Sequence, residues 1–285
     1  MGVVRFVDAE VLILDTLRIM MPNRAFASCI CFAAGMVISG FFNPAIVILG
    51  SLMILCTYCS QAIFNNLIDR EGDRINAPHR PLVSGSLTAE FAWSMMFFLL
   101  ALGFVFAYLA SPVLILFNIL YIFYGIIYSA FTKAKWYLAY FTLATSHVVT
   151  PILSGYLIFG QLDAKILIVI LFMYLTEMIV WSIKDYKDVE GDAKTGIMTL
   201  PVVMNPKKAS QITFLALCLP LVLVWMPWQM LGLSTTFLII YLIAGSIRYY
   251  FGKQLMKNQS PTVAANILNN FRLVLFLQMI GWCLS

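Results

Sequence analysis

Three polar residues at helical spacing form the first group that could carry out chemistry. Asn65, Asp69 and Asp73 follow one another at intervals of four residues, so they share one face if a helix continues through them. Carboxylates on one face repel each other, and a divalent cation held between them would offset that repulsion. Mg²⁺ takes oxygen ligands and usually combines one or two carboxylates with the phosphates of a substrate. The spacing therefore predicts a magnesium site that includes Asp69 and Asp73.

A second group of the same character lies much later in the chain. Asp185, Asp188 and Asp192 also fit one helical face, although Gly191 could break that helix before Asp192. Carboxylates that hold a metal, next to cations that bind phosphate oxygens, are what a pyrophosphate site requires. The alternative is that each group is a set of solvated charges at the end of a helix. The basic residues near the two groups are Arg70, Arg74, Arg80, Lys184 and Lys187.

The elements that position these groups belong in a membrane. The chain has 285 residues, of which 62% are hydrophobic and 11% charged, and its mean hydropathy is +0.91. Soluble domains contain about a quarter charged residues, so a soluble chain of this composition could not cover its own surface. The six cysteines lie in or beside apolar stretches and predict no disulfide framework. Cys56 and Cys59 are interpreted as small buried hydrophobic residues.

Windows of about 20 mostly apolar residues predict membrane-spanning helices. We predict an all-α fold, a polytopic membrane bundle of nine transmembrane helices around a central cavity, formed by residues 1–285 as a single domain. The acidic groups fall in long polar loops, between the second and third and between the sixth and seventh helices. The residues before the first helix are interpreted as an amphipathic segment at the membrane interface, not as a cleaved signal. The nine windows are 25–42, 45–64, 88–109, 112–131, 137–159, 164–183, 207–227, 233–250 and 264–284.

The distribution of Lys and Arg predicts the orientation of this bundle. If the N-terminus is cytoplasmic, the inside segments contain 16 of the 18 basic residues, Arg5 and Arg248 among them. Lys165 then lies outside, and Arg272 lies within the last helix. Both acidic loops face the cytoplasm, and an odd number of spans puts the C-terminus on the opposite side. The net charge of +5 therefore reflects topology and contact with anionic lipid, and it does not indicate a nucleic-acid partner.

These motifs resemble those of the UbiA superfamily of intramembrane prenyltransferases. The first family motif, N-x-x-x-D-x-x-x-D, begins here at Asn65, and the second, D-x-x-D-x-x-x-D, begins at Asp185. Residues 76–85 are similar to the family continuation N-x-P-x-R-P-hydrophobic-x-S-G. Further family-like residues are Gly196 with Thr199-Leu200-Pro201 after the second motif, and Tyr128-Ser129 with Lys133 or Lys135 before the fifth span.

The resemblance implies a fold, a cofactor and a set of site residues. A prenyl pyrophosphate is bound through Mg²⁺ ions bridged to both acidic groups, its tail lies in an apolar tunnel, and the allylic cation is captured by an acceptor. Asp185 or Asp188 is the implied base that deprotonates the acceptor. Carried onto this chain, the implied metal ligands are Asp69, Asp73, Asp188 and Asp192, and the implied pyrophosphate contacts are Asn65, Arg74, Arg80, Lys133 and Lys184.

Differences from the family pattern fall where contacts with the acceptor are expected. Many relatives carry Arg-Glu where this chain has Trp181 and Ser182, and the segment after Lys135 lacks the usual Gly-Asn and contains His147. For His147 the alternatives are a contact with the acceptor and a structural hydrogen bond. Three other polar residues also have two interpretations each. His79 contacts either the pyrophosphate or only its own loop, and Glu177 either lines the cavity or pairs with another helix. Arg272, near Asn266, Asn269 and Asn270, either borders the site or extends its side chain to the membrane interface.

The leading functional hypothesis is Mg²⁺-dependent transfer of a polyprenyl group to a lipophilic acceptor. The wording of the motifs is closest to the digeranylgeranylglyceryl phosphate synthase and chlorophyll synthase branches, which favours a geranylgeranyl donor and geranylgeranylglyceryl phosphate as acceptor. The alternatives are an aromatic quinone precursor or chlorophyllide-like acceptor, cyclisation of a prenyl pyrophosphate without an acceptor, and non-catalytic transport of an anionic lipid. The sequence leaves prenyl length, acceptor and oligomeric state open.

Overall fold

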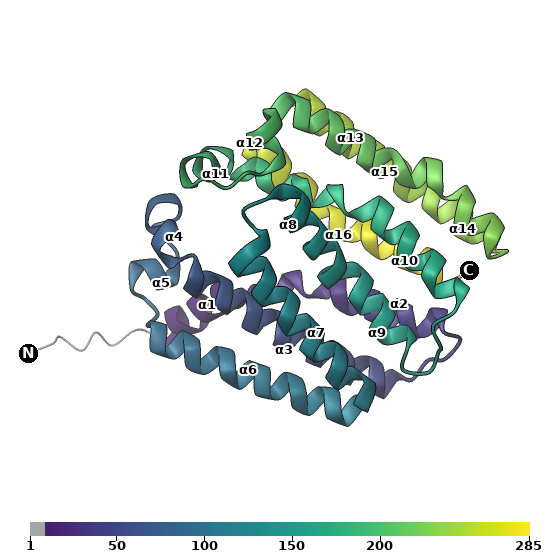
Figure 1. Cartoon of the computed structure of the whole chain (residues 1–285), viewed down its shortest axis with the longest axis horizontal. Helices are drawn as coiled ribbons and strands as arrows, with labels where there is room; N and C mark the ends of the chain where they lie inside the picture. The colour runs from purple at the N-terminus through teal and green to yellow at the C-terminus, as the bar shows by residue number, and fades with distance from the viewer. Residues whose placement is uncertain (1–8) are drawn as a thin grey trace, which may run out of the picture.

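The computed structural model describes residues 9–285 and is helical throughout, with no strand in that range (Figure 1). Arg5, counted above among the inside residues, lies outside the described part, as does the side chain of Asn76 in the family-like stretch. The helices are α1 (Ala9–Met20), η1 (Pro22–Arg24), α2 (Phe26–Ile38), α3 (Pro44–Ile68), α4 (Arg70–Asn76), α5 (Pro81–Ser84), α6 (Ala89–Ala110), α7 (Pro112–Ile127), η2 (Tyr128–Thr132), α8 (Trp136–Ala144), η3 (Thr145–Val149), α9 (Thr150–Tyr156), α10 (Ala164–Glu177), η4 (Ile179–Lys187), α11 (Val189–Thr195), α12 (Leu200–Met204), α13 (Pro206–Leu223), α14 (Trp225–Met230), α15 (Thr235–Lys257) and α16 (Pro261–Cys283).

Side-chain caps and prolines fix where several long helices begin. The Asn43 carboxamide accepts from the Ala45 N–H at 3.0 Å, and Pro44 is the first residue of α3. Proline is favoured there because the first helical N–H has no partner within the helix. Thr88 and Ser260 accept from the N–H groups three residues later in the same way. The polar residues between apolar windows therefore both end one span and start the next.

Eight helical runs in the described chain are long and apolar enough to cross a membrane, and each overlaps one of the predicted windows. The fold class, an all-helical membrane bundle, is confirmed. The window 137–159 corresponds to the run α8–η3–α9, which is not among those eight. That run is interrupted by the π-helical segment η3 and carries several Thr and Ser residues. A ninth crossing therefore stays a prediction, and so does the opposite location of the two termini that depends on it.

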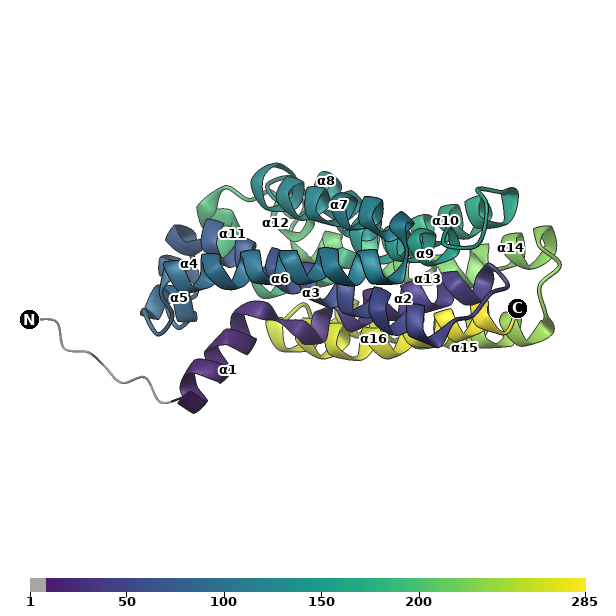
Figure 2. The same ribbon diagram turned by 90° about the horizontal axis from the view of Figure 1, so that it is seen from below.

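The bundle is elongated, and its two ends differ (Figure 2). The short helices α4, α5 and α11 gather at one end, while α14 and the C-terminus lie at the other. Helix α1 leaves the bundle at an angle near the first end, and its residues Ile13, Leu14 and Leu17 are 60%, 47% and 46% exposed. An exposed apolar helix next to a membrane bundle suits the predicted interfacial segment.

Helices α2 and α9 are packed so closely that only glycine fits at their crossing. A side chain at Gly35 would meet the backbone carbonyl of Ile152, and one at Gly155 would meet that of Phe32. Small residues at such crossings let membrane helices approach until their backbones touch. Ser28 then donates to the His147 carbonyl at 3.0 Å, so this pair of helices also fixes the position of η3.

A buried ion pair joins α10 to α15. Glu177 accepts from Arg248, whose Nη2 also donates to the Thr176 carbonyl at 2.6 Å, and Gln278 of α16 lies 3.4 Å from Nη1. Arg248 is fully buried, so its assignment to an inside segment was wrong: the interior of α15 carries it because α10 supplies a buried carboxylate. Of the two interpretations of Glu177, a residue that lines the cavity or one that pairs with another helix, the structure shows the second.

Candidate active site

The first acidic group lies where α3 passes into α4. Helix α3 ends at Ile68, yet the Asp69 N–H donates to the Asn65 carbonyl at 2.9 Å and the Asp73 N–H to the Asp69 carbonyl at 2.8 Å. These bonds continue the helical register through Asp69, so the three residues stay on one face as predicted. The Asn65 side-chain amide donates to Asp69 Oδ2 at 2.9 Å, and Ser129 of η2 donates to Asn65 Oδ1 at 3.2 Å.

Cations neutralise both carboxylates of this group. Lys133 forms an ion pair with Asp69, and Arg80 forms one with Asp73. Burial raises the pKa of the Asp73 carboxyl, while the charges of Arg80 and Lys133 oppose the rise. Arg74 instead pairs with Glu71 at 2.8 Å, and both side chains are more than half exposed, at 58% and 75%. The structure therefore brings Arg80 and Lys133, but not Arg74, to the carboxylates.

The second acidic group spans the passage from η4 to α11. The Asp192 N–H donates to the Asp188 carbonyl at 2.8 Å, and α11 ends only at Gly196, where φ is +74°. Gly191 therefore does not break the helix, and Asp188 and Asp192 keep their helical spacing. Asp188 is exposed, whereas Asp192 is partly buried.

Asp185 differs from the other two members because it is buried and both of its oxygens are occupied. Lys184 donates to Oδ1 at 2.7 Å, and the Tyr140 hydroxyl of α8 donates to Oδ2 at 2.5 Å. The Leu200 N–H in turn donates to the Tyr140 oxygen at 3.3 Å. This carboxylate ties η4 to α8 and α12, which is an arrangement suited to holding neighbouring residues in place.

Direct contacts bring the two acidic groups together. Helix α11 packs against α4, and a parallel backbone bridge joins the segment after Lys133 to the segment after α11. In this bridge the Met198 N–H donates to the Ala134 carbonyl at 2.9 Å and the Trp136 N–H to the Met198 carbonyl at 3.1 Å. The bridge holds the segment that carries Lys133 beside the second group.

The charge of Lys133 acts on carboxylates of both groups. Burial raises the pKa of Asp192 to about 6, with the neighbouring Asp185 charge adding to the rise and Lys184 and Lys133 opposing it. Lys133 also acts on Asp73 of the first group. An ammonium that pairs with one group and influences the charge of the other is suited to stabilise an anion held between them.

The donor set of the two groups fits a hard divalent cation. Every candidate ligand offers oxygen, from a carboxylate or from Asn65, which Mg²⁺ prefers. No three His, Cys, Asp or Glu side chains within residues 9–285 converge on one point as a complete metal cage would require.

The comparison with known proteins gives this arrangement a family. A model of the UbiA prenyltransferase family matches residues 27–279. The chain belongs to the UbiA prenyltransferase family. It is therefore an integral membrane prenyltransferase, and the resemblance drawn from the two motifs is confirmed.

Individual relatives support the family and the fold. The chain is 29% identical over 278 residues to digeranylgeranylglyceryl phosphate synthase from Methanosphaera stadtmanae, covering 94% of this chain and 98% of that protein. The apo structure of a UbiA homologue from Aeropyrum pernix K1 superposes with a TM-score of 0.76 at 16% identity, over 91% of this chain and 96% of that one. A UbiA homologue from Archaeoglobus fulgidus bound to DMAPP and Mg²⁺ gives 0.68 at 19% identity, over 94% and 97%.

The positions that depart from the UbiA pattern point away from the carboxylates. Trp181 lies against the His147 ring with ring centroids 5.2 Å apart, and Tyr58 lies on the same imidazole at 5.3 Å. Ser182 is buried and shares a hydrogen bond of 2.7 Å with Thr213 of α13. His147 therefore belongs to an aromatic cluster between α3, η3 and η4, in which Trp181 lies a few residues before the second acidic group in sequence.

The structure shows contacts of two residues, Tyr140 and Lys133, that the sequence did not specify. Tyr140 bonds Asp185, but nothing in its spacing distinguishes it from the other 12 tyrosines. Lys133 was predicted as a pyrophosphate contact, with Lys135 as the other family-like lysine, and the turn after η2 directs Lys133 to Asp69. His79 is exposed in the loop before α5, and in the described chain its side chain forms no hydrogen bond or ion pair with either acidic group.

Proposed function

We propose that this enzyme transfers a geranylgeranyl group from its pyrophosphate to geranylgeranylglyceryl phosphate, with Mg²⁺ as cofactor. The observation that carries the proposal is the similarity to digeranylgeranylglyceryl phosphate synthase over nearly the full length of both chains. The packing of α4 against α11, with carboxylates and cations from both halves of the chain, supports the pyrophosphate part.

Asp69 and Asp73 on one side, and Asp188 and Asp192 on the other, would hold the metal. Bound there, Mg²⁺ would supply positive charge that favours departure of the pyrophosphate. The chain's own cations act on the same leaving group: Lys133 and Arg80 extend toward the first group, and Lys184 toward the second. Because these charges are held by the helices before the substrate arrives, little reorganisation is needed as the negative charge develops.

The reaction breaks the bond between the allylic carbon and the pyrophosphate oxygen and forms an ether bond to an acceptor hydroxyl. The hydroxyl proton needs a base, and we propose Asp188. Asp185 is less suited because its oxygens accept from Lys184 and Tyr140. Asp188 is exposed, and its carboxylate has no side-chain partner in the described chain. Asp185 is instead a positioning residue for Lys184.

The acidic end of the bundle is proposed to face the cytoplasm. It contains α4, α5 and α11, and it is the end to which the basic residues Lys133, Lys187 and Lys194 belong in sequence. At the other end, Lys165 donates to the Ile38 carbonyl at 2.7 Å. A water-soluble product such as pyrophosphate would then leave into the cytoplasm while both prenyl chains remain in the bilayer.

The test is an incubation of the detergent-purified protein with Mg²⁺, radiolabelled geranylgeranyl pyrophosphate and geranylgeranylglyceryl phosphate. We expect a labelled digeranylgeranyl ether lipid from the wild type and none from Asp69→Asn or Asp188→Asn. Pyrophosphate release without any acceptor, together with a labelled hydrocarbon or terpene alcohol, would instead show a cyclase. Consumption of an aromatic or chlorophyllide-like acceptor in place of the glyceryl phosphate would refute the proposed acceptor but leave the donor half intact.

A further inference from the structure

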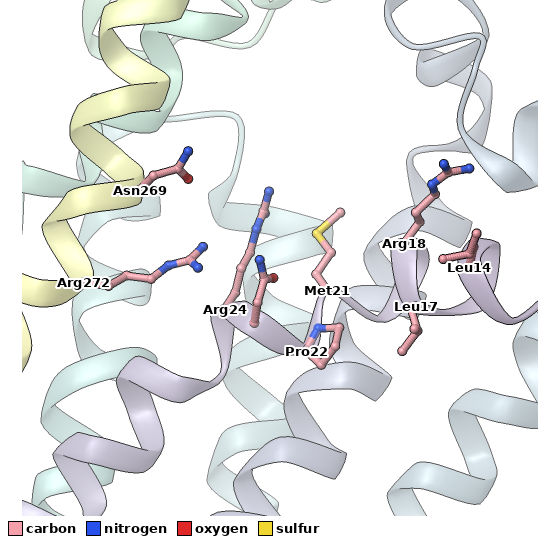
Figure 3. A pocket seen from close by; sticks show the side chains of 9 residues that line it. Leu14, Leu17, Arg18, Met21, Pro22, Arg24, Asn269 and Arg272 are labelled. Atoms are coloured by element: carbon pink, nitrogen blue, oxygen red, sulfur yellow. The ribbon is translucent and has the colours of Figure 1, made fainter.

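A pocket of about 520 Å³ opens where α1 turns into α2, beside α16 (Figure 3). It contains none of the ten residues predicted to bind metal or pyrophosphate or to act as the base. Arg24 comes from the turn η1, and Asn269 and Arg272 come from the first half of α16. Figure 3 shows these three side chains directed toward one another across the gap between the helices. The pocket is thus distinct from the acidic groups and is built by segments far apart in the sequence.

Two arginines line the pocket without an ion-pair partner in the described chain, Arg24, which is exposed, and Arg272, which is partly buried. Among the ion pairs of the described chain, none includes Arg24 or Arg272. Arg18, on the far side of the pocket, already pairs with Asp15 at 2.7 Å and is 68% exposed. Two guanidinium groups that converge without a carboxylate repel each other, and an anion between them would remove the repulsion. Phosphate fits because guanidinium groups bind its oxygens with paired hydrogen bonds.

The opposite wall of the pocket carries three apolar side chains beside Arg18. These are Leu14, Leu17 and Met21. Leu14 and Leu17 are about half exposed on α1, the helix that leaves the bundle at an angle and presents apolar side chains outward. A pocket with a cationic floor and a wall that continues into an exposed apolar helix matches a ligand with a phosphate head and a hydrocarbon chain.

The pocket also lies next to the catalytic end of the bundle. Arg24 is within electrostatic range of Tyr58, His147 and Lys187, and Arg272 acts on Tyr58 as well. Lys187 directly precedes Asp188, the proposed base. Helix α16, which carries Arg272, packs against η4, and α2, which follows Arg24, packs against η3. A molecule bound by these arginines can therefore extend toward Asp188 and the aromatic cluster.

We propose that Arg24 and Arg272, with Asn269, bind the phosphate of a phosphorylated lipid acceptor. The inference rests on the proposed function in one respect, namely that the acceptor is a glyceryl phosphate. In such a molecule the free hydroxyl lies close to the phosphate ester, so fixing the phosphate also directs the hydroxyl toward the base. The pocket then sets the preference for a phosphorylated acceptor over the corresponding alcohol, while the acidic groups bind the donor.

The kinetic test uses Arg24→Gln, Arg272→Gln and the double variant in the full-length enzyme. We expect the KM for geranylgeranylglyceryl phosphate to rise about tenfold or more in each single variant, as expected for loss of a charged hydrogen bond. The KM for geranylgeranyl pyrophosphate should stay within about twofold of wild type, because the donor contacts are elsewhere. The wild type's preference for the phosphate over geranylgeranylglycerol should shrink in the double variant. Lys207→Gln, which removes an exposed charge from the start of α13, is the matched control.

A binding measurement separates failure of this inference from failure of the proposed acceptor. Thermal stabilisation of the purified enzyme is measured with oleoylglyceryl phosphate, with oleoylglycerol and with phosphatidylglycerol, without donor or Mg²⁺. We expect stabilisation by oleoylglyceryl phosphate alone, lost in the double variant. If wild type binds it through the arginines but does not prenylate geranylgeranylglyceryl phosphate, the pocket assignment stands and the acceptor is wrong. Unchanged acceptor KM in the arginine variants, or equal stabilisation by phosphatidylglycerol, would overturn the pocket assignment, the latter by showing a site for bilayer lipid.

Discussion

Lys133 contacts the first acidic group and influences the charge of the second, so one side chain acts on both halves of the site. It pairs with Asp69 and lowers the burial-driven rise of the pKa of both Asp73 and Asp192. Its position depends on the turn after η2 and on the backbone bridge at Met198. Removing its charge should therefore weaken the stabilisation of a pyrophosphate that lies between the groups.

The first prediction concerns Lys133→Met. We expect the rate of pyrophosphate release to fall about 100-fold, the usual scale for losing one group that stabilises developing charge. Lys135→Met is the matched control, because its side chain is exposed and only its backbone takes part in the bridge. Release is followed with a coupled pyrophosphate assay at saturating Mg²⁺. If the two variants were equally active, Lys133 would have no role in the departure of the leaving group.

The second prediction concerns pH. The pKa of Asp192 is raised to about 6, and a metal ligand must be deprotonated, so Mg²⁺ binding is fully supported above that pH and weakens as the pH falls through it. The Mg²⁺ concentration that gives half-maximal activity should rise about tenfold per pH unit below about 6, the slope for one competing proton. Asp192→Asn should need more Mg²⁺ at neutral pH but show a flatter profile. A profile identical in both proteins would assign the pH dependence to the substrate phosphates.

At the scale of residues, the sequence predicts which side chains share a helical face better than it predicts which side chains pair with them. Helical periodicity is local, so the one-face arrangement of Asn65, Asp69 and Asp73 could be foreseen and was observed. The choice of Arg80 over Arg74 depends on how the chain folds back after α4, which spacing does not encode. The site-border interpretation of Arg272 identified one side of the pocket, but its partner Arg24 was missed for the same reason, since α2 and α16 meet only in the folded bundle.

At the scale of elements, the apolar windows located the helices. In lipid, the backbone N–H and C=O groups of each long apolar segment must hydrogen-bond within that segment, and a helix achieves this. They did not reveal which helices carry buried charge. Arg248 looked like an interfacial residue near the end of its window, and only the contact with Glu177 of α10 shows that it is internal. The run Trp136–Tyr156 is helical as predicted, but its polar residues and π-helical segment make it the least apolar of the nine.

The third prediction tests the buried pair. Arg248→Ala leaves the Glu177 carboxylate buried without a partner, and we expect a loss of about 3–5 kcal/mol in the free energy of unfolding. The double variant Glu177→Leu/Arg248→Met removes both charges and should recover most of that loss. Thermal unfolding in detergent gives the comparison. If the double variant were no more stable than Arg248→Ala, the loss would come from packing around the arginine and not from an unpaired charge.

At the scale of the whole molecule, the bundle has an end that carries both acidic groups and an opposite end that carries the C-terminus, and the fourth prediction concerns the sides of the membrane on which they lie. Single cysteines at Thr195 and at Ser285 in a cysteine-free background should react with a membrane-impermeant maleimide from opposite sides, Thr195 from the cytoplasm. This outcome requires that Trp136–Tyr156 crosses the membrane as the ninth span. Labelling of both positions from the same side would show that this run enters and leaves by one face.

The bridge between Ala134–Trp136 and Met198 has a consequence for how such an enzyme can change over evolutionary time. Its two hydrogen bonds run from backbone to backbone, so most substitutions at these positions leave them in place. Proline at position 136 or 198 would be the exception, because it removes a donor. The connection between the two halves of the chain therefore tolerates most side-chain changes at these positions, as far as its hydrogen bonds are concerned.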